Sequence, residues 1–188
     1  MPDKTDRSLR QHLADALLTT DPTQRLRLAQ AGLAMLLMVF SVALLVYAAH
    51  VAGTPPAAVS IWAAVSLGGL LISYLAIRSG WSRRLADPSL TLPQMLFAIG
   101  SGAVGYAMAG PLRGATFPVL LVILMFGMFQ LRPDQVARVG WFATALFAVV
   151  MAVMSQLRPE VYPPAVELGH FLMLAAMLPA VALLAARL

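Results

Sequence analysis

Long apolar runs, separated by short polar or charged segments, form most of this sequence. About 20 apolar residues are enough for an α-helix to cross the roughly 30 Å hydrocarbon core of a bilayer. The backbone finds no water there, so a spanning segment must close its hydrogen bonds within a helix or a barrel. The runs predict an all-α integral membrane bundle of six transmembrane helices, at about 28–50, 58–78, 92–109, 115–131, 135–156 and 165–188.

The first 27 residues have a different pattern. Charged residues are frequent, and the apolar run that follows is too long for the h-region of a signal peptide. Leu9, Leu13 and Leu17 recur at helical spacing, which predicts a short amphipathic helix at the inner membrane face or against a partner subunit. We therefore divide the chain into a cytoplasmic amphipathic segment, 1–27, and a six-span transmembrane domain, 28–188.

Two segments carry the pattern of a helix start. Asp21 is a favourable N-cap, Pro22 follows at the first helical position, and Gln24 comes three residues after the cap. Thr91 and Gln94 have the spacing of a capping box with Thr91 as the cap. These patterns predict helices that begin directly after Asp21 and Thr91.

Small residues recur along one face of the third run. Ser101, Gly105 and Ala109 are four positions apart, and small side chains let a neighbouring helix approach closely. We interpret these three residues as a helix-packing surface.

The last run contains Pro179, where we expect a kink that takes part in signal transmission, because proline removes one backbone hydrogen bond and clashes with the preceding turn. The run reaches Arg187 and Leu188 without a C-cap glycine or a polar tail. We therefore expect the last helix to continue toward a cytoplasmic output domain, in which case the sequence is part of a longer protein.

Composition and charge agree with a membrane protein. Hydrophobic residues make up 60% of the chain and charged residues 11%, against roughly 25% charged residues in soluble domains. Lys and Arg concentrate in cytoplasmic loops, and with both termini inside, only Arg113 and Arg158 of the 13 Lys and Arg residues lie outside. This bias predicts an N-in/C-in topology. We therefore attribute the formal net charge of +5 to anchoring at the lipid bilayer, and we expect no nucleic-acid partner.

Ionisable residues within the runs are candidates for a ligand-binding site, because such residues usually face a bundle interior or a wet cavity. Glu167 and His170 are three residues apart and therefore share one face of the last helix. His50 ends the first run, one turn after Tyr47, and the topology puts all of these residues on the outer side. The alternative is that Glu167 and His170 only bond to nearby loop groups.

Arg113 lies in a glycine-rich outer loop and has several interpretations. It could pair with Glu167 or Glu160, or it could hold an anionic ligand or a lipid headgroup. The remaining interpretation is an exposed loop arginine without a specific role.

The sequence requires no cofactor, and haem, quinone and lipid remain open. Haem ligation by His50 and His170 is one hypothesis, without a supporting motif, and no other metal site is predicted. Cysteine is absent, which excludes disulfides, thiolate metal sites and a cysteine nucleophile. The sequence also lacks an HExxH motif, a nucleophile elbow and a carboxylate pair within a span, so no catalytic residue is predicted.

Three segments resemble the N-terminal membrane region of certain bacterial diguanylate cyclases, in which a six-helix, MASE-type sensor precedes a cytoplasmic GGDEF domain. These segments are DPSLTLPQM at 87–95, GYAMAGPLRGATFPVLLVILMFGMF at 105–129 and YPPAVELGHFLMLAAMLPA at 162–180. The resemblance implies a multi-pass protein of the bacterial inner membrane and a homodimer, because two cyclase domains must face each other to join two GTP molecules. No GGDEF signature occurs in the 188 residues, so the chain itself is not expected to be an enzyme, although the parent protein would be a diguanylate cyclase.

The resulting expectation is a membrane-embedded sensory domain that regulates cyclic di-GMP synthesis. A ligand or membrane cue on the outer-leaflet side would shift the last helix, which passes the change to the output domain. One alternative is a small membrane transporter or channel. Another is a haem- or quinone-binding sensor of a histidine kinase. A membrane enzyme that acts on lipids or quinones agrees least with the sequence, since no acid/base constellation is present.

Overall fold

The computed structural model describes residues 21–128 and 130–187, and this part of the chain is helical without strands. The predicted amphipathic helix around Leu9, Leu13 and Leu17 lies outside the described residues. Two short 3-10 helices, η1 (Trp81–Arg84) and η2 (Gly110–Ala115), lie in the loops. The six long helices are α2 (Pro22–Ala52), α3 (Pro56–Arg78), α4 (Thr91–Met108), α5 (Thr116–Met128), α6 (Pro133–Leu157) and α7 (Pro164–Arg187).

These helices coincide with the six predicted runs, so the all-α prediction is confirmed. By length and composition, five segments of the described chain could cross a bilayer: Gln24–Ala52, Pro56–Arg78, Gly110–Gly127, Pro133–Leu157 and Pro164–Val181. The helix that does not qualify is α4, because glycines and polar residues such as Gln94 and Tyr106 lower its hydropathy. Large apolar side chains are exposed on all six helices, and soluble monomers rarely expose so much apolar surface. The protein therefore has the character of a membrane-spanning helical bundle.

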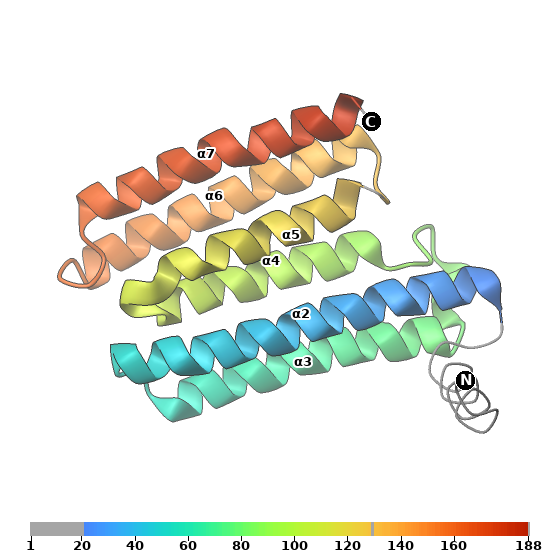
Figure 1. The fold of residues 1–188 in the computed structure, drawn as a ribbon, viewed down its shortest axis with the longest axis horizontal. Helices are drawn as coiled ribbons and strands as arrows, with labels where there is room; N and C mark the ends of the chain where they lie inside the picture. The colour runs from blue at the N-terminus through green and yellow to red at the C-terminus, as the bar shows by residue number, and fades with distance from the viewer. Residues whose placement is uncertain (1–20, 129, 188) are drawn as a thin grey trace, which may run out of the picture.

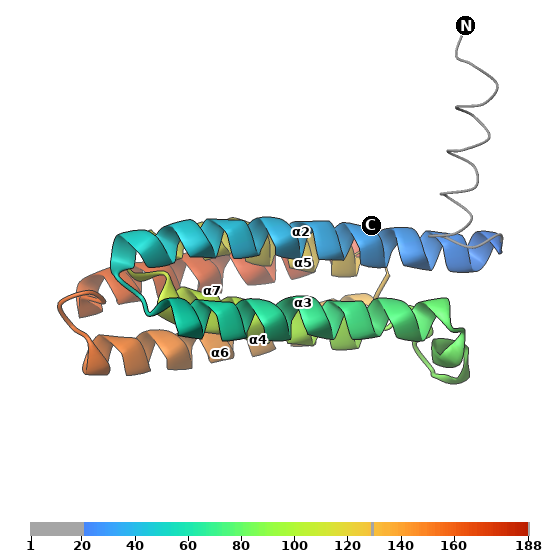
Figure 2. The ribbon, with the colours of Figure 1, turned by 90° about the horizontal axis from the view of Figure 1, so that it is seen from below.

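The helices form three hairpins that lie side by side in two layers (Figure 1). Each hairpin pairs consecutive helices: α2 with α3, α4 with α5, and α6 with α7. Figure 2 shows α2, α5 and α7 in one layer and α3, α4 and α6 in the other. The central helix is α4, which contacts α2, α3, α5 and α6. Because neighbours enclose it, α4 can carry more small and polar residues than a lipid-facing helix.

The hairpin arrangement separates the charged residues into two groups. The start of α2 and the end of α7 lie at one end of the bundle, which we call the basic end (Figure 1). The opposite, distal end carries the α2–α3, α4–α5 and α6–α7 connections. The described arginines at the basic end are Arg25, Arg27, Arg78, Arg83, Arg84, Arg132, Arg138 and Arg187, and the charged residues at the distal end are Arg113, Arg158, Glu160 and Glu167.

The main core lies among α4, α5, α6 and α7. Tyr106 and Phe147 are completely buried there and pack edge to face, with ring centroids 5.7 Å apart. A smaller cluster joins α2 and α3 to α4 and contains Leu45, Ala48, Trp62 and Ala109. In lipid, helix association depends on such close packing and on interhelical hydrogen bonds rather than on release of water.

The small-residue face of α4 packs against α2 and α3. The indole Nε1 of Trp62 donates to the Ser101 carbonyl at 2.9 Å, and the Ser66 and Ser101 hydroxyls are 2.6 Å apart. A Cβ at Gly105 would lie 3.6 Å from the Trp62 ring. A Cβ alone would therefore make an ordinary contact with the ring, and only a longer side chain would displace it.

The structure confirms one predicted helix start and corrects the other. Helix α2 begins at Pro22 as predicted, with the Gln24 amide 3.4 Å from the Asp21 carboxylate. The Gln24 side chain reaches across to α3 and donates to the Ile77 carbonyl at 2.5 Å.

A kink was predicted at Pro179 in the last helix. Helix α7 is one continuous α-helix through Pro179.

The predicted capping role of Thr91 is wrong. Thr91 is the first residue of α4, and its hydroxyl donates to Gln130 at 3.0 Å. The Asp87 carboxylate accepts the free Leu92 amide at 3.0 Å instead. Leu90 has a left-handed conformation, φ 53°, which turns the chain so that Asp87, rather than Thr91, reaches this amide.

The packing at Gly105 yields a stability prediction. We expect Gly105→Leu to destabilise the protein by about 1–3 kcal/mol, because the larger side chain would collide with Trp62. A Cβ at Gly100 on the same helix would meet nothing within 4 Å, so Gly100→Leu is the matched control. Unfolding of both variants in detergent, followed by circular dichroism, measures the effect. Equal stability of the two variants would contradict the proposed close packing.

Candidate functional site: a buried charge cluster

A cluster of polar side chains is buried at the distal end of the bundle. Helix α4 contributes Tyr106, η2 contributes Arg113, and the first two turns of α7 contribute Glu167 and His170. Arg113 and Glu167 are each only 4% exposed, and Tyr106 is completely buried. The cluster thus joins α7 to α4 and η2, which are consecutive in the chain but distant in sequence from α7.

The ion pair of Arg113 and Glu167 is its centre. The Arg113 Nε donates to Glu167 Oε1 at 2.7 Å, and a second guanidinium nitrogen lies 2.7 Å from the same oxygen. The remaining guanidinium nitrogen donates to the Gly110 carbonyl at 2.9 Å. Glu167 also lies in the first turn of α7, where the helix dipole favours a negative charge. This pairing was one of the alternatives predicted for Arg113.

The second Glu167 oxygen connects the ion pair to Tyr106 and His170. The Tyr106 hydroxyl donates to Glu167 Oε2 at 2.5 Å and lies 2.8 Å from His170 Nδ1. A tyrosine hydroxyl has one proton, so a hydroxyl that donates to the carboxylate must accept from His170. The Nδ1 of His170 therefore carries a proton, and in a neutral imidazole Nε2 has a free lone pair.

Tyr162, in the loop before α7, packs against the other side of the cluster. The Arg113 guanidinium lies 4.7 Å from the centre of its ring, a cation–π distance. The Tyr162 hydroxyl donates to the Ala107 carbonyl at 2.8 Å and accepts the Gly110 amide at 3.3 Å. Burial raises the pKa of Tyr162 above the ordinary tyrosine value, so this hydroxyl remains protonated.

Gly110 is required for this geometry. Its φ is +53°, a left-handed conformation that glycine adopts without the steric cost of a Cβ. A Cβ would also lie 2.7 Å from the Ala52 side chain at the end of α2. Glycine therefore lets η2 approach α2 while its carbonyl accepts from Arg113.

We call Tyr106, Arg113, Glu167 and His170 together the clamp, because their bonds hold α7 to α4 and η2 and leave neither Glu167 oxygen free for a reaction. Both oxygens of Glu167 have donors, and no buried side-chain polar atom in the described part of the chain lacks a partner. The His170 side chain is partly exposed, at 23%, and packs edge to face on Phe117 with centroids 5.0 Å apart. Its Nε2 is the atom through which an outside group could bond to the cluster.

The structure unites only some of the residues predicted for the site. Arg113, Glu167 and His170 come together, whereas Tyr47 and His50 are exposed on α2. His50 lines a separate hollow beside the α2–α3 turn. The residues that line this hollow do not include His170. Within residues 21–128 and 130–187, no three His, Asp or Glu side chains gather as metal ligands.

Sequence reasoning missed Tyr106 and Tyr162. A signal for Tyr106 was its position as a polar aromatic residue in a run of small and apolar residues, because a buried tyrosine hydroxyl normally has a hydrogen-bond partner. Nothing in its spacing identified Glu167, 61 residues away, as that partner.

Comparison with known proteins identifies no relative. No protein-family description, no curated protein and no solved structure matches the chain. The function must therefore be argued from the geometry and from the resemblance of the three segments described above.

The buried ion pair yields a second prediction. We expect Glu167→Gln to destabilise the protein by about 3–5 kcal/mol, because it leaves the Arg113 charge buried without a counter-ion. Glu160→Gln, at the exposed loop carboxylate of the same end, is the matched control and should change stability by less than about 0.5 kcal/mol.

A double variant separates the ion pair from general packing. Arg113→Met combined with Glu167→Gln should recover part of the lost stability, since it removes the unpaired charge. Unfolding in detergent measures all of these variants. Arg113→Met alone completes the set, and a loss in the double variant equal to the sum of the two single losses would show that the two charges do not interact.

Proposed function

We propose that this chain is a sensory, signal-transmitting domain of the bacterial inner membrane, with six spans and both termini in the cytoplasm. In this proposal it regulates cyclic di-GMP synthesis by a C-terminal GGDEF domain and acts as a homodimer. The observation that carries the proposal is the buried clamp, because it ties the first turns of the last helix to η2 and α4. The resemblance of three segments to MASE-type sensors supports the identity of the output domain.

The separation of charge supports the proposed orientation. Eight described arginines occupy the basic end, whereas Arg113 and Arg158 are the arginines of the distal end. The positive-inside rule then assigns the basic end to the cytoplasm. Helix α4 counts as the sixth span in this proposal, because it extends between the same two ends as its neighbours.

The clamp offers a route from an outer cue to the cytoplasm. Helix α7 packs along α6, and its first turns bond to Arg113 and Tyr106. A cue that changes these bonds alters which position of α7 is most stable, and a continuous helix carries the shift to its other end. The proposal requires that α7 can take two positions relative to α4 and η2. A stimulus works only if it favours one of these two positions over the other. His170 Nε2 is the point of the clamp at which such a stimulus can act.

The orientation can be tested by labelling, since the chain has no cysteine of its own. Ala86 and Glu160 are exposed in loops at the basic and distal ends. We expect a membrane-impermeant maleimide to label Glu160→Cys in intact spheroplasts, and to label Ala86→Cys only after lysis. The reverse pattern, or labelling of both variants in intact spheroplasts, would contradict the N-in/C-in topology.

The signalling role can be tested in the full-length protein that carries this region. His170→Ala removes one hydrogen bond of the clamp, worth about 1 kcal/mol, which should change the ratio of the two positions roughly fivefold. We expect the cellular cyclic di-GMP concentration to change by several fold at equal protein level. Glu160→Gln, which does not contact the clamp, is the control. An unchanged concentration in His170→Ala and in Glu167→Gln, with normal expression, would refute the signalling role of the clamp.

A further inference from the structure

A second feature, separate from the clamp, is a long groove between α2 and α5. The groove consists of two adjoining hollows, and helix α4 forms its floor. The two hollows are continuous, since both are lined by Ser41, Trp62, Ala98, Gly102, Val119 and Ile123.

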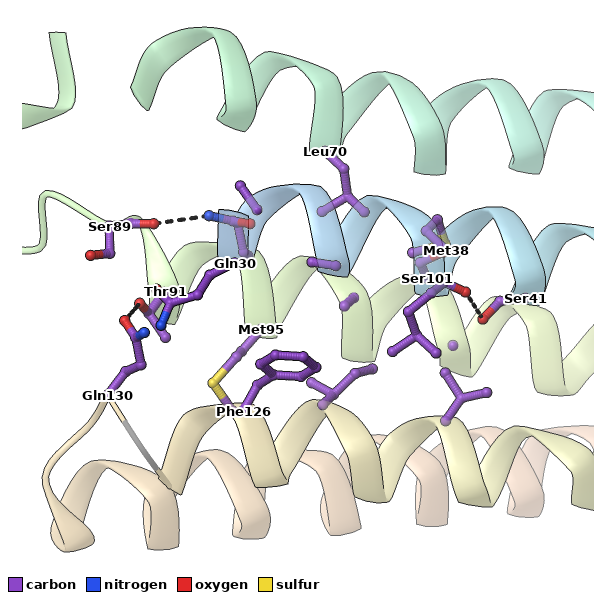
Figure 3. Close-up of a pocket in the computed structure, with 18 of the residues that line it drawn as sticks. Gln30, Met38, Ser41, Leu70, Ser89, Thr91, Met95, Ser101, Phe126 and Gln130 are labelled. Carbon is purple, nitrogen blue, oxygen red and sulfur yellow. Dashed lines mark hydrogen bonds between the residues drawn. The ribbon is translucent and has the colours of Figure 1, made fainter. Parts of the chain in front are cut away.

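The groove is long and predominantly apolar. Along α4 it extends from Gln94 to Ala109, a length of about 22 Å at the 1.5 Å rise of an α-helix. One leaflet of a bilayer has a hydrocarbon depth of about 15 Å, so the groove can hold an extended lipid tail. Figure 3 shows Met95 and Phe126 inside the hollow nearer the basic end. Methionine adapts its shape to irregular apolar ligands.

The end of the groove near the basic end is polar. Gln30, Ser89, Thr91 and Gln130 gather there in Figure 3. Thr91 donates to Gln130 at 3.0 Å. Arg27 also lines this mouth and lies one turn before Gln30 on α2.

The mouth has a positive charge without a counter-ion among residues 21–128 and 130–187. Among the described residues, Arg27 forms no ion pair, and no carboxylate lines the groove. The nearby carboxylates have other partners: Asp87 accepts backbone amides at the start of α4, and Asp21 pairs with Arg83 at 2.7 Å. A cation beside an apolar tail site is complementary to an anionic headgroup.

From this combination we propose that the groove binds an anionic amphiphile with one extended apolar tail. The tail lies between α2 and α5 over α4, and the carboxylate or phosphate head accepts hydrogen bonds from Arg27 and Gln30. Binding by the groove does not depend on the proposed signalling function, because the head lies at the basic end and the proposed cue acts at the opposite, distal end. The far hollow is lined by Leu112 and Thr116, on either side of Arg113, so a long tail would reach the segment that carries the clamp.

Fluorescence of Trp62 offers a direct test. Trp62 lines both hollows and is 8% exposed, whereas Trp81 and Trp141 are 55% and 63% exposed. In a variant with Trp81→Phe and Trp141→Phe, all tryptophan fluorescence comes from Trp62. The probes are a fatty acid and a lysophosphatidylglycerol with bromine atoms in mid-chain, added to the full chain in nanodiscs of zwitterionic lipid. We expect saturable quenching of Trp62 by these anionic probes.

Three comparisons show whether the quenching comes from the groove. Arg27→Gln should weaken binding of the anionic probes about tenfold, since it removes a charge-assisted hydrogen bond. Arg84→Gln, at an exposed arginine of the same end, should leave the affinity unchanged. Ala98→Leu, which fills the wall shared by both hollows, should abolish saturable quenching while helix content and melting temperature remain normal.

The outcomes separate the possible failures. Equal affinity for a brominated neutral monoacylglycerol would refute the anionic headgroup, and quenching that does not saturate or is unaffected by Ala98→Leu would refute the groove. Binding of only the fatty acid or only the lysophospholipid would identify the head as a carboxylate or a phosphate. Saturable binding would support this inference even if cyclic di-GMP were unchanged in His170→Ala and Glu167→Gln, so the two proposals can fail independently.

Discussion

The ion pair between Arg113 and Glu167 is the interaction on which the distal end depends. Taking two charges out of water costs several kcal/mol per ion, and the cost is offset only when geometry and additional hydrogen bonds are nearly complete. Here Gly110 and Tyr106 supply these bonds, and the Tyr162 ring covers the guanidinium. The chain must therefore bring η2, α4, α7 and the loop before α7 together at once, which makes the pair a strict constraint on their relative positions.

The central position of α4 makes both the clamp and the groove possible. Its small residues admit the Trp62 ring on one side, and its end presents Tyr106 to Glu167. The helix lies between neighbours on several sides, so it does not need the apolar surface of a lipid-facing helix. The same small residues leave a hollow over Ala98 and Gly102, where α2 and α5 stand apart.

The clamp and the groove have different roles in the bundle: the groove is a site for a ligand, and the clamp connects helices. The groove offers an apolar tail site with a positive mouth at the basic end, and its far hollow ends beside η2. The clamp holds η2 to α7, and α7 returns to the basic end as one helix. An amphiphile in the groove and the last helix are thus both in contact with η2 or its flanking residues, which is the physical basis for coupling between them.

Local patterns in the amino-acid order were sufficient for the helices and for part of the site. Apolar run length, together with Pro22 after Asp21, predicted where helices lie, because hydrophobic length and backbone restriction are properties of short segments. The free-energy cost of an ionisable residue within an apolar run is also a property of a short segment, and it singled out Glu167 and His170. The partners of these residues depend on how distant helices pack, and so only the folded bundle selected Tyr106 over His50, gave the α4 cap to Asp87 instead of Thr91, and opened a groove beside α5. Sequence spacing carries no information on which of several buried donors lies within 3 Å of a carboxylate, since that distance is set by helix packing.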